Sequence, residues 1–120
     1  MKNLINFRKA FDFASDKAKF SGGEASASVK GAVGTSVIVT PEGWGVKYHA
    51  TVVAFFPNLG YPKFDSGGFY TPTTARRMNQ ALQLAGSEWT VRRDRGDFVV
   101  TLRNSAVHGN TSEGRFTNKY

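Results

Sequence analysis

The sequence predicts an α+β fold, an antiparallel β-sheet of four to five strands covered by one helix, in the order strand, strand, optional strand, helix, strand, strand. Two patterns predict it. Residues 35–66 and 88–103 alternate with a period of two and are rich in β-branched and aromatic side chains, as half-buried strands are. Between them, residues 71–85 place apolar side chains three and four apart, as on the buried face of a helix.

The first strand is expected at 35–40 and a longer one at 46–56, with Pro41 beginning the turn between them. Residues 61–66 favour a short third strand. Proline lacks an amide hydrogen, so Pro62 restricts that strand to a sheet edge or places the proline at a strand start. Because the turns are short, the neighbouring strands can pair as antiparallel hairpins.

The central helix has a clear start and a clear end. Thr71 can accept a hydrogen bond from the first turn, Pro72 suits the first helical position, and Gly86 favours the left-handed backbone that ends a helix. Two strands are then expected at 88–93 and 97–103, joined by a tight turn.

Four segments are expected along the chain. Residues 1–20 have the apolar stripe of an amphipathic helix, and 21–34 are Gly, Ala and Ser-rich, as in a flexible linker. The α+β core domain spans 35–103, and the aperiodic, polar residues 104–120 read as a flexible tail. The pattern leaves open whether the first helix packs on the core.

Composition restricts the classes of function. The chain has 120 residues, enough for one domain, and a net charge of +7, which favours polyanionic partners. The absence of cysteine excludes disulfides, thiol nucleophiles and thiolate zinc sites. No apolar run approaches the ~20 residues that cross a bilayer, so we expect no membrane partner and a cytoplasmic location. The sequence does not indicate the oligomeric state.

The helix start is a candidate anion site. Gly67 and Gly68 allow close approach of a ligand to the backbone, and the amides of the first helical turn point toward the same place. The polar side chains expected to contribute are Thr73, Thr74, Arg76 and Arg77. The simpler interpretation is that the glycines only turn the chain and Thr71 only caps the helix.

The last predicted hairpin is strongly basic. Its arginines are Arg92, Arg93, Arg95 and Arg103. Such a hairpin can follow a phosphate backbone, because each phosphate that it neutralises releases counterions. Alternatively, Asp94 and Asp97 balance the arginines and the hairpin is only a solvated face. Aromatic residues outside the predicted core, such as Phe69 and Tyr70, could stack on bases.

Catalysis has weak support. The two histidines, His49 and His108, fall in different predicted elements, and no carboxylate pair has a spacing that forces it together. We therefore expect a protein that is not an enzyme, with no cofactor and no metal site.

Three stretches of the chain resemble a pattern in small uncharacterised proteins of bacteriophages and prophages: Tyr48 to Val53, Asp65 to Phe69 and Thr71 to Gln80. In that pattern a Gly-Gly-aromatic sequence precedes a Thr-rich, Arg-containing helix start. The resemblance covers about half the chain. It implies a phage protein acting in the host cytoplasm and implies no activity.

A second, looser resemblance covers about 30 residues. The helix ending at Gly86, the strand with Trp89, the basic turn with Gly96 and the strand that follows are similar to HicA-type RNA-cleaving toxins, which have a double-stranded-RNA-binding-domain-like fold. Those toxins carry a catalytic histidine just after the turn glycine, where this chain has Asp97. The resemblance therefore implies binding of RNA or DNA without cleavage.

These observations favour a small, basic, phage-type protein that binds the phosphate backbone of DNA or RNA, single-stranded or double-stranded. One alternative is an inhibitor or modulator of a host protein, such as RNA polymerase or a defence nuclease, that docks through the first helix with Leu4, Phe7 and Phe11. A further alternative is a virion or assembly component.

Overall fold

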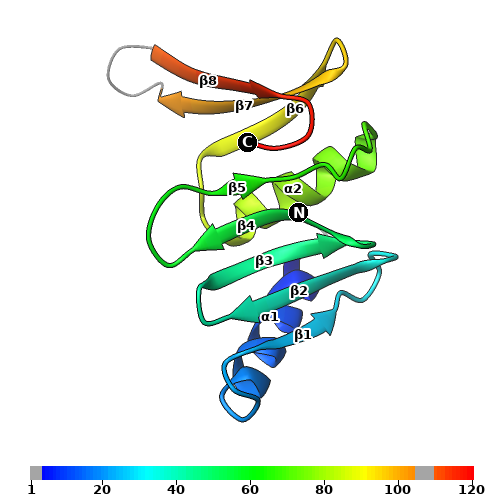
Figure 1. The fold of residues 1–120 in the computed structure, drawn as a ribbon, viewed down its shortest axis with the longest axis vertical. Helices are drawn as coiled ribbons and strands as arrows, with labels where there is room; N and C mark the ends of the chain where they lie inside the picture. The colour runs from blue at the N-terminus through cyan, green and yellow to red at the C-terminus, as the bar shows by residue number, and fades with distance from the viewer. Residues whose placement is uncertain (1–3, 105–109) are drawn as a thin grey trace.

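The computed structural model describes residues 4–104 and 110–120, and the side chains of 4–101 and 114–120. The fold is α+β with antiparallel strands, as predicted, but the strands form two sheets instead of one (Figure 1). The elements in chain order are α1 (Leu4–Ala18), β1 (Ala25–Ser28), β2 (Thr35–Thr40), β3 (Gly43–Tyr48), β4 (Thr51–Pro57), β5 (Lys63–Phe64), α2 (Pro72–Leu84), β6 (Trp89–Asp94), β7 (Asp97–Asn104) and β8 (Asn110–Phe116).

The larger sheet has five strands in the order β1-β2-β3-β4-β5, so every strand pairs with its neighbour in sequence. The single strand predicted at 46–56 is divided into β3 and β4 by a tight turn, in which His49 has the left-handed φ of 54°. A bulge follows Val46 in the β3–β4 pairing. It lets the consecutive residues Val53 and Ala54 both be buried, which strict alternation would not allow.

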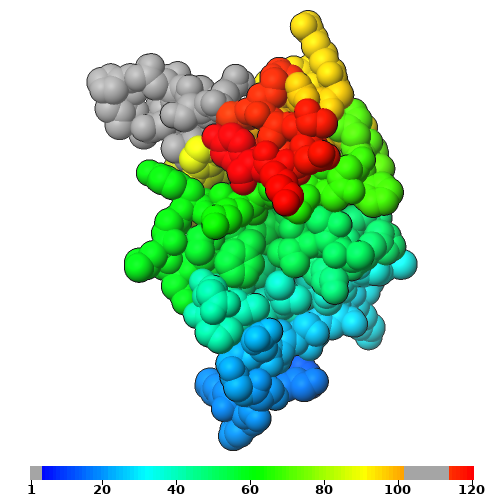
Figure 2. Space-filling model, in the orientation of Figure 1, coloured from blue at the N-terminus to red at the C-terminus, as the bar shows by residue number. Residues whose placement is uncertain are grey.

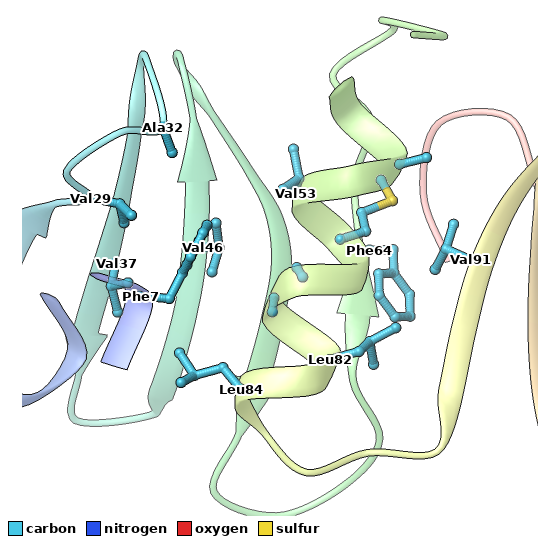
Figure 3. Close-up of a cluster of buried hydrophobic side chains, with 14 of the residues drawn as sticks. Phe7, Val29, Ala32, Val37, Val46, Val53, Phe64, Leu82, Leu84 and Val91 are labelled. Atoms are coloured by element: carbon cyan, nitrogen blue, oxygen red, sulfur yellow. The ribbon is translucent and has the colours of Figure 1, made fainter. Parts of the chain in front are cut away.

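Both helices cover the same face of this sheet, α1 over β1 and β2 and α2 over β3 and β4. The helices bring Phe7, Met78 and Leu82, all fully buried, against inward-facing valines such as Val37 and Val46. Figure 3 shows α2 running between the five-stranded sheet and strand β6. Burial of this kind contributes ~25 cal/mol per Å² of apolar surface. Helix α2 has buried residues and contacts strands of both sheets, so it lies at the centre of the core.

Helix α1 packs on the core, which answers the question that its sequence pattern leaves open. Phe7, Ala10 and Ala14 are buried, and Phe11 meets Trp44 edge-on at 5.1 Å between ring centroids. The segment predicted as a linker, 21–34, contains strand β1 and the buried residues Val29 and Ala32. Small side chains there allow β1 to lie close under α1, so the segment is part of the sheet.

The tail prediction is wrong for residues 110–120. Strand β8 pairs with β7 along its whole length, and Phe116 is buried against Phe98, with ring centroids 5.3 Å apart. Residues 117–120 then reach the larger sheet, where Tyr120 and Phe64 exchange backbone hydrogen bonds of 2.9 and 3.1 Å. The prediction failed because this pairing is long-range and local periodicity does not report it. Residues 105–109 lie outside the described residues.

The predicted boundaries of α2 are confirmed. Thr71 is the N-cap, its hydroxyl accepts a 3.1 Å hydrogen bond from the Thr74 amide, and Pro72 begins the helix. Gly86 has φ 72° just after the end of the helix.

In the middle of α2, the Asn79 side chain bonds the backbone of Val91 twice. Its Nδ2 donates to the Val91 carbonyl at 2.7 Å, and its Oδ1 accepts from the Val91 amide at 2.8 Å. This side chain therefore pairs with β6 as an additional strand would.

We predict that Asn79→Ala lowers the free energy of unfolding by about 2–3 kcal/mol, because it leaves the carbonyl and amide of buried Val91 without partners. Urea denaturation followed by circular dichroism measures this change. The control is Gln83→Ala on the exposed face of the same helix, which should change stability by less than about 0.5 kcal/mol. Equal losses in the two variants would contradict the role of Asn79.

Candidate nucleic-acid interface

The fold brings the two regions singled out in the sequence together at Tyr70. This residue ends the glycine loop before α2, and its hydroxyl accepts a 3.2 Å hydrogen bond from the Gly96 amide in the β6–β7 turn. The Arg93 guanidinium lies over the Tyr70 ring, 5.0 Å from the centroid. The other contact of the ring is edge-on to Phe98 in the core. Tyr70 therefore connects the basic hairpin to the helix start.

The β6–β7 turn is a two-residue hairpin turn in which both central residues are left-handed, Arg95 with φ 53° and Gly96 with φ 88°. This is the arrangement of type I′ turns, which match the twist of paired strands. Left-handed φ is unusual for a side chain as long as arginine. Arg95 is exposed at the tip of the hairpin and precedes Gly96, whose amide Tyr70 binds.

The glycine loop is fixed by its own polar side chains. The Asp65 carboxylate accepts from the Gly67 amide at 2.8 Å, and the Ser66 hydroxyl accepts from the Gly68 amide at 3.1 Å. Gly67 has φ 65°, and a Cβ there would clash with the Thr51 hydroxyl. The loop presents the ring of Phe69, which is 65% exposed, beside Tyr70.

The outer face of the smaller sheet carries a cluster of charges in which arginines and aspartates are paired. Arg115 donates to Asp94 at 2.6 Å and to Asp97 at 3.3 Å, and Arg92 lies 3.9 Å from Asp94. The Arg115 hydrogen bond is the main cause that lowers the pKa of Asp94, and the Thr117 hydroxyl is the main cause that lowers the pKa of Asp97. These pairs reduce the positive potential of this face.

Four of the predicted phosphate-binding arginines are exposed and one is not described. Arg93 lies over the Tyr70 ring, and Arg95 precedes Gly96, whose amide Tyr70 binds. Arg92 lies in the charge cluster, and Arg76 is exposed on α2. The side chain of Arg103 lies outside the described residues.

The structure corrects the prediction that Arg77 binds phosphate, because this residue is buried and points into the core. Its Nε donates to the Thr35 hydroxyl at 2.9 Å and its Nη1 to the Gln80 side chain at 2.8 Å, while the guanidinium lies over the Tyr48 ring. Burial is the main cause that lowers its pKa, and the neighbouring positive charge of Arg76 adds to it. Arg77 therefore connects α2 to β2 and is not available to phosphate.

The structure also corrects the prediction that Thr74 contacts phosphate. It has no exposed surface, and its hydroxyl shares a 2.8 Å hydrogen bond with the hydroxyl of Thr71. Thr73 is only half-buried. The simpler interpretation of the helix start, a capped turn, therefore describes Thr71 and Thr74.

The three residues predicted to dock a partner, Leu4, Phe7 and Phe11, face the chain's own core. Phe7 is fully buried and the other two pack against the same cluster. The apolar stripe of α1 therefore contacts the five-stranded sheet of the same chain.

Sequence reasoning missed Arg115 as a partner of the hairpin, and it gave no role to the Arg93–Tyr70 contact. Arg115 lies in the segment assigned to the tail, and only the register of β8 with β7 places it beside Asp94 and Asp97. Tyr70 did have a signal, since it is an aromatic residue outside the periodic core pattern.

A concave region of ≈ 350 Å³ lies beside the β3–β4 turn, and His49, Ser66, Phe69 and Thr71 are among its lining residues. No carboxylate lines it, so His49 has no acidic partner there. Within the part of the chain that the structure describes, no group of three or more histidine or acidic side chains could hold a metal ion. His108 lies outside the described residues.

Neither described helix is long and apolar enough to cross a lipid bilayer. No protein-family model, curated protein or solved structure matches this chain.

Arg77→Ala is expected to lower the free energy of unfolding by about 2–3 kcal/mol, because the Thr35 hydroxyl and the Gln80 amide lose a buried partner and the core loses packing. The exposed neighbour provides the control: Arg76→Ala removes the same charge and should change stability by less than about 0.5 kcal/mol. Chemical denaturation of both variants checks this, and an unchanged midpoint for Arg77→Ala would show that its burial contributes little.

The lowered pKa values of Asp94 and Asp97 predict an acid-sensitive hairpin. In the unfolded chain these carboxyls take up protons near the ordinary value of 3.8, whereas the folded state holds them ionised to lower pH. Their stabilising contribution is therefore present above about pH 5 and is lost as pH falls through the lowered folded pKa values. The melting temperature measured from pH 6 to pH 2 should fall less steeply for Asp94→Asn/Asp97→Asn than for the unaltered protein. Parallel curves would contradict this.

Proposed function

We propose that this protein binds nucleic acid through its phosphate backbone, at the surface formed by Phe69, Tyr70, Arg93 and Arg95. The observation that carries the proposal is the contact between Arg93 and Tyr70, together with the hydrogen bond from Gly96 to the Tyr70 hydroxyl. These contacts join the most basic turn of the chain to the loop that begins α2. We call these four residues the Tyr70 surface.

The chemistry of the Tyr70 surface suits a polyanion. The aromatic ring restricts the Arg93 guanidinium, so less side-chain entropy is lost when it binds a phosphate. Arg95 is exposed at the hairpin tip, where it can approach a backbone without steric hindrance. Phe69, the residue before Tyr70, provides an exposed ring, and an exposed aromatic ring can stack on an unpaired base.

The charge cluster on the outer face supports the choice of these two arginines over their neighbours. Arg92 shares the Asp94 carboxylate with Arg115, so the cations there are already offset by anions. Arg93 has an aromatic partner instead, and Arg95 lies at the tip. We therefore expect Arg93 and Arg95 to contribute more to phosphate binding than Arg92.

Fluorescence anisotropy against matched single- and double-stranded DNA and RNA, over a salt series, tests the proposal. The logarithm of the affinity should fall linearly with the logarithm of the salt concentration, and Arg93→Ala/Arg95→Ala should reduce the slope by about 1.4 to 1.8. The matched control, Lys17→Ala/Lys19→Ala, removes the same charge from the exposed end of α1 and should leave the slope nearly unchanged.

Two results would overturn the proposal. One is an affinity that does not change from low to moderate salt for every nucleic acid tested. The other is an equal loss of binding in the Arg93/Arg95 variant and the lysine control, since that would assign the binding to net charge instead of the Tyr70 surface.

A further inference from the structure

The two edges of the five-stranded sheet differ. At one edge, β5 pairs with the chain itself, since Phe64 and Tyr120 exchange backbone hydrogen bonds and the Ser66 amide donates to Asn118 at 2.7 Å. The other edge is β1, which pairs with β2 and is the first strand in the sheet order. Figure 1 shows β1 at the end of the molecule away from the three-stranded sheet, and Figure 2 shows the same separation between the blue N-terminal segments and the red C-terminal residues.

The backbone of β1 has groups that point away from β2. The Val29 amide donates to the Thr35 carbonyl at 2.9 Å, and Val29 stands two positions beyond Ala27, which is paired with Val37. In an antiparallel ladder every second residue turns its amide and carbonyl toward the neighbouring strand. The residues between, Ser26 and Ser28, therefore direct theirs outward, and both are exposed.

Helix α1 already binds one group on this edge. Two residues beyond Ser28, the Lys30 carbonyl accepts a 2.9 Å hydrogen bond from Asn6 Nδ2. The strand itself, Ala-Ser-Ala-Ser, has neither a proline nor a charged side chain, the usual features that prevent another strand from pairing with an edge. Its small side chains allow a neighbouring backbone to approach.

A groove of ≈ 540 Å³ runs along this edge between α1 and β1. Ala10 is buried at its base and Phe13, which is 62% exposed, lies on its helix side. The ionisable side chains that line the groove are Lys9 and Lys30, and no carboxylate lines it. The groove thus combines an apolar base, an exposed aromatic ring, two cations and a free row of backbone donors and acceptors.

We propose that this groove binds an extended, acidic peptide segment of a partner protein, which adds to β1 as a further strand. The outward groups of Ser26 and Ser28 match the hydrogen-bonding pattern of a peptide backbone, and alternate side chains of that peptide would contact Ala10 and Phe13. Lys9 and Lys30 attract acidic residues at its two sides. A nucleic acid offers no such backbone ladder. The site is separate from the Tyr70 surface and does not depend on it.

The probe is a fluorescein-labelled octapeptide of alternating glutamate and valine, titrated with the full-length protein. Two control peptides separate the contributions: one has lysine in place of glutamate, and the other is the acidic peptide N-methylated at every second amide, which keeps the charge but removes the donors. We expect binding of the acidic peptide and affinities lower by about tenfold or more for both controls, consistent with the loss of charge pairing or of two hydrogen bonds.

Ser26→Pro removes an outward amide without disturbing the bonds between β1 and β2, and should weaken peptide binding by about tenfold, whereas Ser26→Thr should not. Lys9→Glu/Lys30→Glu should weaken it similarly. The charge-matched control is Lys17→Glu/Lys19→Glu, at the C-terminal end of α1 and just beyond it. Hydrogen exchange keeps the test valid even if Ser26→Pro unfolds, because bound peptide should slow exchange of the Ser26 and Ser28 amides in the unaltered protein.

Equal binding of the methylated and unmethylated peptides, or unchanged exchange at Ser26 and Ser28 when peptide is bound, would overturn the proposal. Light scattering tests the competing occupant. If the protein alone is a dimer and Ser26→Pro makes it a monomer, a second copy of this chain occupies the edge and the partner-peptide proposal is wrong.

Discussion

Two polar side chains on helix α2, Arg77 and Asn79, connect that helix to both sheets. Arg77 bonds Thr35 in the larger sheet, and Asn79 bonds the backbone of Val91 at the edge of the smaller one. Apolar packing is not directional, so it does not by itself fix the rotation of α2 about its axis. The hydrogen bonds of Arg77 and Asn79 are directional, and they fix both this rotation and the position of α2 between the sheets. Because β6 is held there, the basic turn that follows it reaches Tyr70, so the geometry of the Tyr70 surface depends on bonds in the interior.

Features determined by neighbouring residues were predictable from the sequence. The cap at Thr71, the stop at Gly86 and the hairpin around Arg95 and Gly96 each depend on a few adjacent residues, and all were placed correctly. The turn at His49 was missed because its residues are not typical turn formers, and the left-handed φ there is imposed by the strands on either side.

Features determined by distant contacts were not predictable. Arg77 has the same local pattern as exposed Arg76, and only the position of Thr35 and Tyr48 across the core explains why it is buried. Likewise the polar composition of residues 110–120 indicates a loop, although β7 supplies a partner for every backbone group on one side of β8. The sequence pattern singles out Arg92, Arg93 and Arg95, but only the register of three strands shows that Arg93 has an aromatic partner and that Arg92 lies with Arg115 in the charge cluster.

The pairing of Ser66 with Asn118 joins segments 52 positions apart along the chain, whereas the other strands of the larger sheet pair with near neighbours in sequence. Closing so long a loop costs entropy before its hydrogen bonds form, so we expect this pairing to form after the local hairpins. Until it forms, the sheet has two unpaired edges instead of one. The concentration at which the chain folds then matters, because encounters between such partly folded molecules compete with the closure of β5.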